Sequence, residues 1–405
     1  MKNTIKRILS VLLVAGLLAT LLVGCSGTNN TNSDVVEDTK AAETEATGGN
    51  NSETVEEPKE LKTVRFGLLP YQDWMPWILA DELGYFEEAG IDLEVITFTD
   101  DITCAEALQS GDIDIACGNS NSGPMALSRF PELRVISCTC GFLGYAIMVR
   151  PDDVAENGGD IKTYEDFYKE EIANGTPEDE AMKIATANAC AQLKGRTIVM
   201  DRGTGSNLPL NAALKAANLT TDDLKFMDIS DVEGALAFLD GSGDFELGGY
   251  PQVTSLSEQG CYKLVSAAEL GGESVCLSVE MARADYIEEN MDTIIAMREA
   301  WYKAIDNIYS DDTSYMEKLA EITGRYTGTE ISLEAMTNIA ENIDPWPTKE
   351  EASEIFFADG GKWNMEEIYT GSLSYWVNIS GQVEEGTVDL QVQVDTVKGI
   401  HSNVK

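Results

Sequence analysis

The sequence predicts an α/β fold, and three observations support this fold class. Apolar strands alternate with helical segments between residues 63 and 118, which is typical of a mainly parallel sheet covered by helices. The chain has 405 residues, which is too long for one compact domain and suits two. Hydrophobic residues make up 43% of the chain, enough for a large core. We therefore expect two α/β domains.

The elements follow one another in a regular order. We expect a first strand at 63–69, a proline-containing loop at 70–76 and a helix from about residue 77 to residue 84. A second strand at 91–98 begins with alternating apolar residues, and a helix at about 101–110 leads into a short strand at 111–118. Further helices are expected at 286–326 and beyond residue 347.

The N-terminus has the pattern of a signal peptide. Basic residues precede an apolar run at 8–23, which is shorter than the roughly 20 residues needed to span a bilayer. The run ends in Leu22-Val23-Gly24-Cys25, which resembles the lipobox of bacterial lipoproteins. We expect removal of 1–24 and lipidation of Cys25; a plain secretory peptide is the alternative. Residues 25–60, poor in apolar side chains, would form a disordered tether.

Composition excludes several classes of function. Seventy acidic against 28 basic side chains give a formal charge of −42, which repels nucleic acid. The single histidine, His401, is the fifth residue from the C-terminus, which we expect to be loose, so catalysis by a buried imidazole is disfavoured. Seven cysteines follow Cys25, and we favour buried free thiols over one or two disulfides or a metal or redox site. No metal and no cofactor are expected.

Several segments in order resemble one protein family. The segment Glu-Leu-Gly-Tyr-Phe-Glu-Glu-Ala-Gly-Ile at 82–91, the segment Gly-Asp-Ile-Asp-Ile-Ala at 111–116, Leu-Lys-Gly-Arg at 193–196 and Gly-Thr-Gly-Ser at 203–206 are similar to the ABC-importer substrate-binding family of sulfonate, taurine, nitrate and thiamine-pyrimidine-precursor binders. The resemblance covers roughly residues 63–280. It implies a two-lobed periplasmic-binding-protein-like fold of type 2, with the ligand in a cleft between lobes.

The resemblance also implies where the chain crosses between lobes. The first crossing would lie near 145–150 and the return near 248–251. Lobe 1 would then comprise 61–149 and lobe 2 would comprise 150–248, while 249–405 would hold the return to lobe 1 and C-terminal helices. Residues 152–192 depart from the family and are expected to form an acidic helical insertion on lobe 2.

The ligand is expected at the strand-to-helix junctions, because open α/β sheets bind ligands beyond the carboxyl ends of their strands. Three loops, at 71–74, 119–122 and 202–207, carry hydroxyl, amide and aromatic side chains. Helix N-termini after these loops would suit an oxyanion, although ordinary capping explains each loop singly. The candidate ligand-binding residues are Tyr71, Gln72, Asp73, Trp74, Asn119, Ser120, Asn121, Phe142, Tyr145, Thr204, Gly205, Ser206 and Tyr250.

The ligand's charge stays open at this point. Asp73 disfavours an anion, and Arg202 is the only base in the three loops. The aromatic residues of the candidate set could instead form a box for a planar heterocycle or a cation, whereas Trp77 is expected in the core. A sulfonate-like anion and a pyrimidine-like ring are both compatible with the sequence.

These observations predict a membrane-tethered receptor on the extracytoplasmic face. It would act as a monomer, capture a small solute and deliver it to ABC permease and ATPase subunits, without enzymatic activity. The first alternative is a pyrimidine-precursor synthase-like enzyme on the same fold, which would need a reactive lysine and histidines. The second is a ligand-sensing partner of a membrane signalling protein.

Overall fold

The computed structural model describes residues 61–405 except 203, 204 and 329. The expected signal peptide, Cys25, the tether at 25–60 and Thr204 lie outside the described residues. Contacts between Cα atoms make residues 58–405 one compact unit. Within the described residues, no helix combines the length and the apolar character that crossing a membrane requires.

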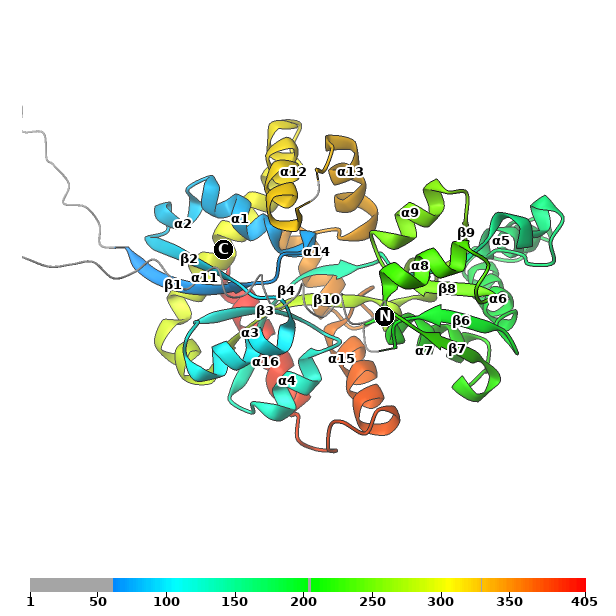
Figure 1. Cartoon of the computed structure of the whole chain (residues 1–405). Coiled ribbons are helices and arrows are strands. Elements are labelled where there is room, and N and C mark those ends of the chain that lie inside the picture. The colour runs from blue at the N-terminus through cyan, green and yellow to red at the C-terminus, as the bar shows by residue number, and fades with distance from the viewer. Residues whose placement is uncertain (1–60, 203–204, 329) are drawn as a thin grey trace, which may run out of the picture. The chain divides into compact units, whose positions relative to one another are not determined.

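Two five-stranded sheets organise this unit (Figure 1). The first has the order β2-β1-β3-β10-β4; β1 runs parallel to β2 and β3, and β10 runs antiparallel to β3 and β4. Its strands are β1 (Lys62–Leu68), β2 (Ile91–Thr97), β3 (Ile115–Asn119), β4 (Leu133–Phe142) and β10 (Cys276–Arg283).

The second sheet repeats this plan with the order β7-β6-β8-β5-β9. Strand β6 runs parallel to β7 and β8, and β5 runs antiparallel to β8 and β9. Its strands are β5 (Ala146–Val149), β6 (Thr197–Met200), β7 (Lys225–Asp228), β8 (Phe245–Gly248) and β9 (Tyr262–Ser266). In each sheet the strand antiparallel to its neighbours is the one that follows a crossing from the other sheet.

The crossings differ in part from the sequence-based expectation. The first lies at 143–145, between β4 and β5. The return lies at 267–275, between β9 and β10, later than the expected 248–251. The reason is that β9 pairs with β5 and adds an edge strand to the second sheet before the chain goes back. The second lobe thus takes in residues on both sides of 150–248.

Helices cover both sheets. Those of the first lobe are α1 (Met75–Glu82), α2 (Tyr85–Glu88), α3 (Asp101–Ser110), α4 (Gly123–Arg129), α11 (Ala284–Ile308), α12 (Ser314–Thr327), α13 (Leu333–Asn338), α14 (Lys349–Ala352), α15 (Met365–Ser374) and α16 (Leu390–Asn403). Those of the second lobe are α5 (Tyr164–Ala173), α6 (Glu178–Ala191), α7 (Asn207–Ala216), α8 (Asp231–Leu239), α9 (Gln252–Glu258) and α10 (Ala267–Leu270). The expected acidic insertion is thus helical, because α5 and α6 pack on each other.

The core of the first lobe is continuous from β1 to α16. Trp77 is buried there, as expected, and its ring lies against Phe86 and Trp301. Its indole Nε1 donates a hydrogen bond of 2.8 Å to the buried carboxylate of Glu280. Gln393 of α16 accepts a hydrogen bond from the backbone N–H of Val135 in β4, which fixes the C-terminal helix to the sheet. The chain after β10 therefore belongs to the first lobe's core.

The seven cysteines in the described part of the chain are all buried and unpaired. This confirms the preference for free thiols. Burial raises the pKa of each of these thiols, for example to about 12 for Cys190. The reactive thiolate is therefore scarce at neutral pH.

Candidate functional site

A cavity of about 530 Å³ lies where residues of both lobes meet, a volume within the usual range for small-molecule sites. Its wall comes from the loop after β1, the first residue of α3, the ends of β3 and β4 and the first crossing segment. The loop after β8, the start of β10, helix α12 and the residues on either side of α13 complete it. The residues that line it are Pro70, Tyr71, Gln72, Asp73, Trp74, Asp101, Asn119, Phe142, Tyr145, Gly249, Tyr250, Pro251, Cys276, Ser278, Thr323, Tyr326, Thr327, Ile331 and Ile339.

The loop after β1 supplies the floor of the cavity. After the strand ends at Leu68, a 3-10 turn over Gln72–Trp74 leads directly into α1. Tyr71 is 51% exposed, whereas Asp73 is 7% and Trp74 3% exposed. Trp346 fixes the turn, because its indole Nε1 donates a hydrogen bond of 3.0 Å to the backbone oxygen of Asp73. The turn thus holds a carboxyl group and an indole against the cavity.

Asp73 belongs to a buried carboxyl pair with Asp344. Gln72 Nε2 donates a hydrogen bond of 2.8 Å to one oxygen of Asp344, and the thiol of Cys140 lies 3.7 Å from the other. The hydroxyl of Ser278 donates to one oxygen of Asp73. Burial, followed by repulsion from Asp344, raises the pKa of Asp73 well above its usual value, and burial raises the pKa of Asp344 to about 7. The pair therefore favours a state in which one carboxyl keeps its proton.

The same cluster is the described group with ligand atoms close enough for a metal ion. The ligand atoms of Asp73, Cys140 and Asp344 lie within 4.8 Å of one another. All three groups have raised pKa values, so a metal would have to displace their protons. Gln72 and Ser278 already hydrogen-bond two of the oxygens. The arrangement suits a carboxyl pair that holds a proton, and we assign no metal to it.

A second carboxyl group, Asp101, stands at the start of α3. Asn119 Nδ2 donates a hydrogen bond of 3.0 Å to one of its oxygens. Asn119 Oδ1 meanwhile accepts hydrogen bonds from the backbone N–H groups of Asn121 and Ser122, which shapes the loop after β3. Partial burial raises the pKa of Asp101. Two acidic side chains thus line the cavity from different elements.

Aromatic rings form much of the remaining wall. Phe142 and Tyr145 pack edge to face with centroids 4.8 Å apart, and Tyr71 lies 6.2 Å from Trp74. Burial, followed by repulsion from Asp344, raises the pKa of Tyr250. Gly205 comes so close to Tyr145 that a Cβ there would lie 2.4 Å from the tyrosine oxygen. The second lobe therefore reaches the aromatic wall through a residue that has no side chain.

The structure brings together eight of the thirteen predicted ligand-binding residues. These eight, which line the cavity, are Tyr71, Gln72, Asp73, Trp74, Asn119, Phe142, Tyr145 and Tyr250. Sequence reasoning missed Asp101 and Ser278, although Asp101 begins α3 and Ser278 lies near the start of β10, and both elements begin at the cavity. It also missed Thr323, Tyr326 and Thr327 of α12, for which a helical sequence pattern gave no signal.

Four of the other predicted residues do not line the cavity. Ser120 is fully buried, and its hydroxyl accepts the backbone N–H of Leu277 at 2.9 Å. The backbone oxygen of Asn121 accepts hydrogen bonds from Ser372 and Trp376. Gly205 lies behind Tyr145, and the hydroxyl of Ser206 donates to the backbone oxygen of Asp201 at 2.7 Å. These residues hold loops together. Thr204 lies outside the described residues.

Ordinary capping, the simpler explanation for the loops at 119–122 and 202–207, also differs in detail. Ser122 and Ser206 occupy the N-cap positions of α4 and α7, but neither side chain makes a capping hydrogen bond. Arg202 is exposed, and its guanidinium lies over the ring of Phe226 at 4.5 Å from the centroid. Arg202 does not line the cavity. The loop at 202–207 therefore brings no basic side chain to it among the described residues.

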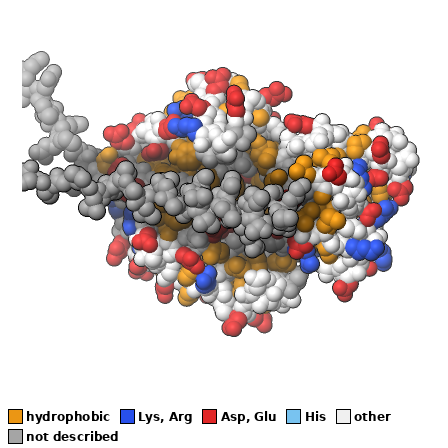
Figure 2. Space-filling view, in the orientation of Figure 1, with side chains coloured by type: hydrophobic (Ala, Val, Ile, Leu, Met, Phe, Trp, Pro, Cys, Tyr) orange, Lys and Arg blue, Asp and Glu red, His pale blue; other side chains and the backbone are white. Residues whose placement is uncertain are grey.

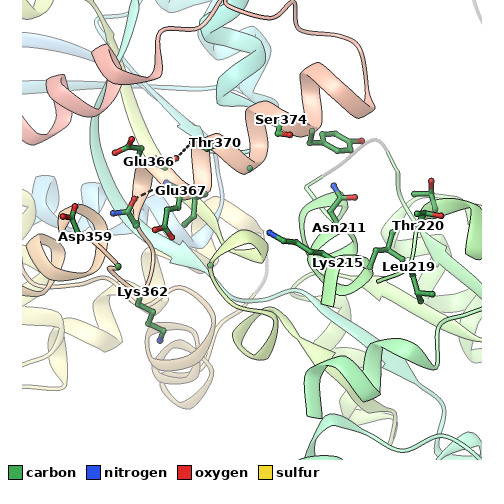
Figure 3. Close-up of a pocket in the computed structure, with 18 residues that line it drawn as sticks. Asn211, Lys215, Leu219, Thr220, Asp359, Lys362, Glu366, Glu367, Thr370 and Ser374 are labelled. Carbon is green, nitrogen blue, oxygen red and sulfur yellow. Dashed lines mark hydrogen bonds between the residues drawn. The ribbon is translucent and has the colours of Figure 1, made fainter. Parts of the chain in front are cut away.

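A larger groove of about 1140 Å³ lies between α7 and α15 (Figure 3). Lys215 and Asn211 of α7 stand on one side, and Glu367, Thr370 and Ser374 of α15 on the other. Most of its labelled side chains are exposed, whereas the smaller cavity holds buried carboxyl and indole groups. Because buried polar groups are costly to leave without partners, we take the smaller cavity as the candidate site.

His401 is not at a loose terminus, which corrects the sequence-based expectation. It lies in α16, where its Nε2 is 2.8 Å from the hydroxyl of Ser353 and its Nδ1 is 3.3 Å from that of Tyr302. Burial lowers its pKa to about 4. The reason is that α16 packs on β4 and α11, so the C-terminal residues are ordered. The imidazole does not line the cavity.

Comparisons with known proteins agree with this architecture. A model of the NMT1-like family matches residues 57–324. A search of curated protein sequences found no significant match to the chain. Among solved structures, the periplasmic aliphatic sulphonate binding protein SsuA from Escherichia coli is 16% identical with a TM-score of 0.59, over 82% of this chain and 91% of that one.

Two further structures are similar. A putative periplasmic sulfonate-binding protein SsuA from Methylobacillus flagellatus is 14% identical with a TM-score of 0.59, over 85% of this chain and 95% of that one. The ligand-binding component of an ABC-type import system from Staphylococcus aureus, with zinc bound, is 12% identical with a TM-score of 0.55, over 85% and 99%. At these identities the likeness shows the fold, which is that of periplasmic binding proteins, as expected.

Proposed function

Because the chain belongs to the NMT1-like family, we propose that it is the solute-binding component of an ABC importer and binds a small organic solute in the 530 Å³ cavity. The observation that carries this proposal is the cavity's position. It lies at the carboxyl ends of β1 and β3 and is lined by residues of both lobes. Periplasmic-binding-protein folds close on ligands at such a cleft by hinge motion.

The crossing segments supply the hinge in this proposal. Residues 143–145 and 267–275 connect the two sheets, and Tyr145 belongs to the first of them. The backbone oxygen of Tyr145 accepts a hydrogen bond of 2.9 Å from the N–H of Ala267 in the second. A solute that contacts Tyr145 would therefore bear directly on the segment that bends. Binding and closure constitute the mechanism, and no chemical step is involved.

The cellular setting is also part of the proposal. Lipidation of Cys25 would anchor the protein to the extracytoplasmic face of the cell membrane, with 25–60 as its tether. A monomer would then deliver the solute to permease and ATPase subunits. The synthase alternative needs a reactive lysine and histidines, and among the described residues that line the cavity none is a lysine or a histidine. Transport therefore has more support than catalysis.

The test is solute binding by a variant that leaves the core intact. Tyr71 is half exposed, so Tyr71→Ala removes a ring from the cavity wall at little expected cost in stability. Tyr168→Ala is the matched control, because this tyrosine lies in α5 and stacks on Tyr164, away from the cavity. A thermal-shift screen against sulfonates, nitrate, pyrimidines, amino acids and polyamines identifies a stabilising solute.

The expected result is specific to the cavity. Tyr71→Ala weakens binding of that solute at least tenfold in calorimetry, and Tyr168→Ala leaves it unchanged. Equal affinity in both variants would mean that the solute binds elsewhere and would refute the assigned cavity.

A further inference from the structure

The wall of the cavity offers acceptors that have no donor. Within the described part of the chain, Oδ1 of Asp73 and Oδ1 of Asp101 are buried and have no hydrogen-bond partner. Asp73 is 7% exposed and lines the cavity, as Asp101 does. A buried carboxyl oxygen without a partner costs free energy, above all in the charged form, and burial accordingly raises the pKa of both groups. The pocket is therefore incomplete without a group that donates hydrogen bonds or carries positive charge.

Three polar side chains of the wall already donate to carboxylates and so are not free to bind an anion. Gln72 Nε2 donates to Asp344, Asn119 Nδ2 donates to Asp101, and the Ser278 hydroxyl donates to Asp73. The indole Nε1 of Trp74 is the exception, because it is buried without a partner among the described residues and remains available to an acceptor atom of the solute. None of the described lining residues is Lys, Arg or His. A sulfonate or carboxylate placed here would meet two acidic side chains and no compensating base.

The aromatic rings of the wall favour a cation. Tyr71, Trp74, Phe142, Tyr145 and Tyr250 all line the cavity. The face of an aromatic ring is the negative pole of its quadrupole and attracts a cation within about 6 Å of the centroid. The rings also bury the apolar part of a solute. The carboxyl groups and the ring faces thus both favour a positively charged solute.

The long-range field acts in the same direction. The chain's formal charge is −42, and Figure 2 shows Asp and Glu side chains spread over the visible face in greater number than Lys and Arg. Such a field raises the local concentration of cations and repels anions, with an effect that salt weakens. Capture of a cation is therefore favoured before any contact forms.

We propose that the solute is an organic cation, an inference that rests on the proposed function. Its positive nitrogen lies against Asp73 and Asp101, and its apolar frame lies against the aromatic wall. Asp344 lies in the same buried cluster as Asp73, with Gln72 and Cys140, and its repulsion raises the pKa of Asp73. A positive charge bound beside Asp73 offsets this repulsion and favours the ionised carboxylate. Asp344 lies beyond residue 324, where the match to the family model ends. The charge preference thus arises partly from a C-terminal segment outside that match.

The positive nitrogen could be a protonated amine or a quaternary ammonium group, and matched probes separate the two. Choline is paired with isethionate, which has the same hydroxyethyl frame with a sulfonate in place of the ammonium. Benzylamine is paired with benzylsulfonate, and benzyl alcohol serves as the neutral member. The full chain, purified in mild detergent, is titrated with each probe by calorimetry at pH 8 and low salt. A preference for choline indicates a quaternary ammonium solute, and a preference for benzylamine a protonated amine.

Charge-neutralising variants locate the effect. Asp101→Asn keeps an oxygen that can accept from Asn119, and Asp73→Asn relieves its repulsion with Asp344. Asp359→Asn is the control, because this carboxylate is exposed in the groove of Figure 3. We expect the cationic member of at least one pair to bind at least tenfold more tightly than its sulfonate. We also expect Asp101→Asn and Asp73→Asn each to weaken that cation at least tenfold, with Asp359→Asn unchanged.

Two results would overturn the inference in different ways. The first is tighter binding of the sulfonates, or equal binding of benzyl alcohol and benzylamine, while Tyr71→Ala still weakens binding of the probe. That result would refute the preference for a cation but leave the proposed solute-binding function standing. Binding of no cationic, neutral or anionic probe, here or in the broader solute screen, would count against the cavity as a solute site and so against both.

Discussion

Replacing Asp344 with Asn should change how stability depends on pH. Asp344 is fully buried, and burial raises its pKa from the ordinary 3.8 to about 7. Because the folded state holds the proton more tightly than the unfolded state, stability is lost as the pH rises from about 4 to about 7. A shift of about three pH units corresponds to roughly 4 kcal/mol. Asp344→Asn removes this loss, since Asn carries no charge at any pH.

The groups around Asp344 set the details. Asp73, Cys140, Tyr250 and Tyr309 are the titratable groups that interact with it, and Gln72 hydrogen-bonds it. Repulsion from Asp344 is the second cause of the raised pKa of Asp73, so neutralising Asp344 also lowers that pKa. In Asp344→Asn, Asp73 therefore ionises more readily, and burial of its charge costs part of the stability that the substitution adds. About 4 kcal/mol is then the upper limit of the increase in the free energy of unfolding.

The assay is urea denaturation followed by circular dichroism at pH 4 and pH 8. We expect the variant and the wild type to have similar free energies of unfolding at pH 4. At pH 8 the variant should be the more stable by about 1–4 kcal/mol. Asp359→Asn, at an exposed carboxylate, should follow the wild type at both pH values. Parallel curves for Asp344→Asn and the wild type, or a variant less stable at pH 8, would refute the assignment of a protonated buried carboxyl pair.

Further predictions concern other parts of the structure. The imidazole of His401, whose burial lowers its pKa to about 4, should titrate in NMR spectra well below pH 6; a midpoint near 6.5 would mean that α16 is not packed. The seven described thiols should resist a thiol reagent in the native protein and react after unfolding, whereas rapid native labelling would contradict their burial. Gly205→Val should push against Tyr145 and weaken solute binding at least tenfold, while unchanged affinity would show that the two lobes tolerate a side chain there. Trp77→Phe should lower stability by about 1–3 kcal/mol, because Glu280 loses a buried donor; an unchanged denaturation midpoint would argue against that hydrogen bond.

The C-terminal segment changes the candidate site in a way that its position in the chain does not suggest. Residues 325–405 follow the match to the family model, yet Tyr326, Thr327, Ile331 and Ile339 line the cavity and Asp344 lies behind Asp73. Ser372 and Trp376 hold the loop after β3 through the backbone oxygen of Asn121. The segment outside the family match therefore forms part of the candidate site.

The acidic insertion has a more limited role. Helices α5 and α6 pack on each other, on β9 and on α7, and none of their residues lines the cavity. The insertion therefore extends the second lobe without forming part of the described pocket. Its exposed acidic side chains, such as Glu170 and Glu178, add to the negative field of that lobe.

The sequence by itself determined the local features of this protein. The alternation of Ile91, Leu93 and Val95 predicted β2, and α3 begins and ends where its sequence pattern indicated. The loop after β1 could be expected to line a cavity, as it does, because strand-to-helix junctions of one sheet meet at the same edge. Trp77 could be placed in the core. These predictions succeeded because local periodicity and sheet geometry decide them.

Only the tertiary structure decided which side chains meet. Ser120 has the same chemistry as a ligand-binding hydroxyl, yet β10 occupies it through the N–H of Leu277. Asp344 lies 271 positions from Asp73 in the chain, and no local pattern could bring the two carboxyls together. Their pKa values, and the charge preference of the cavity, follow from that meeting and from burial. Long-range packing fixed both, because electrostatic effects depend on distance and dielectric surroundings rather than on order in the chain.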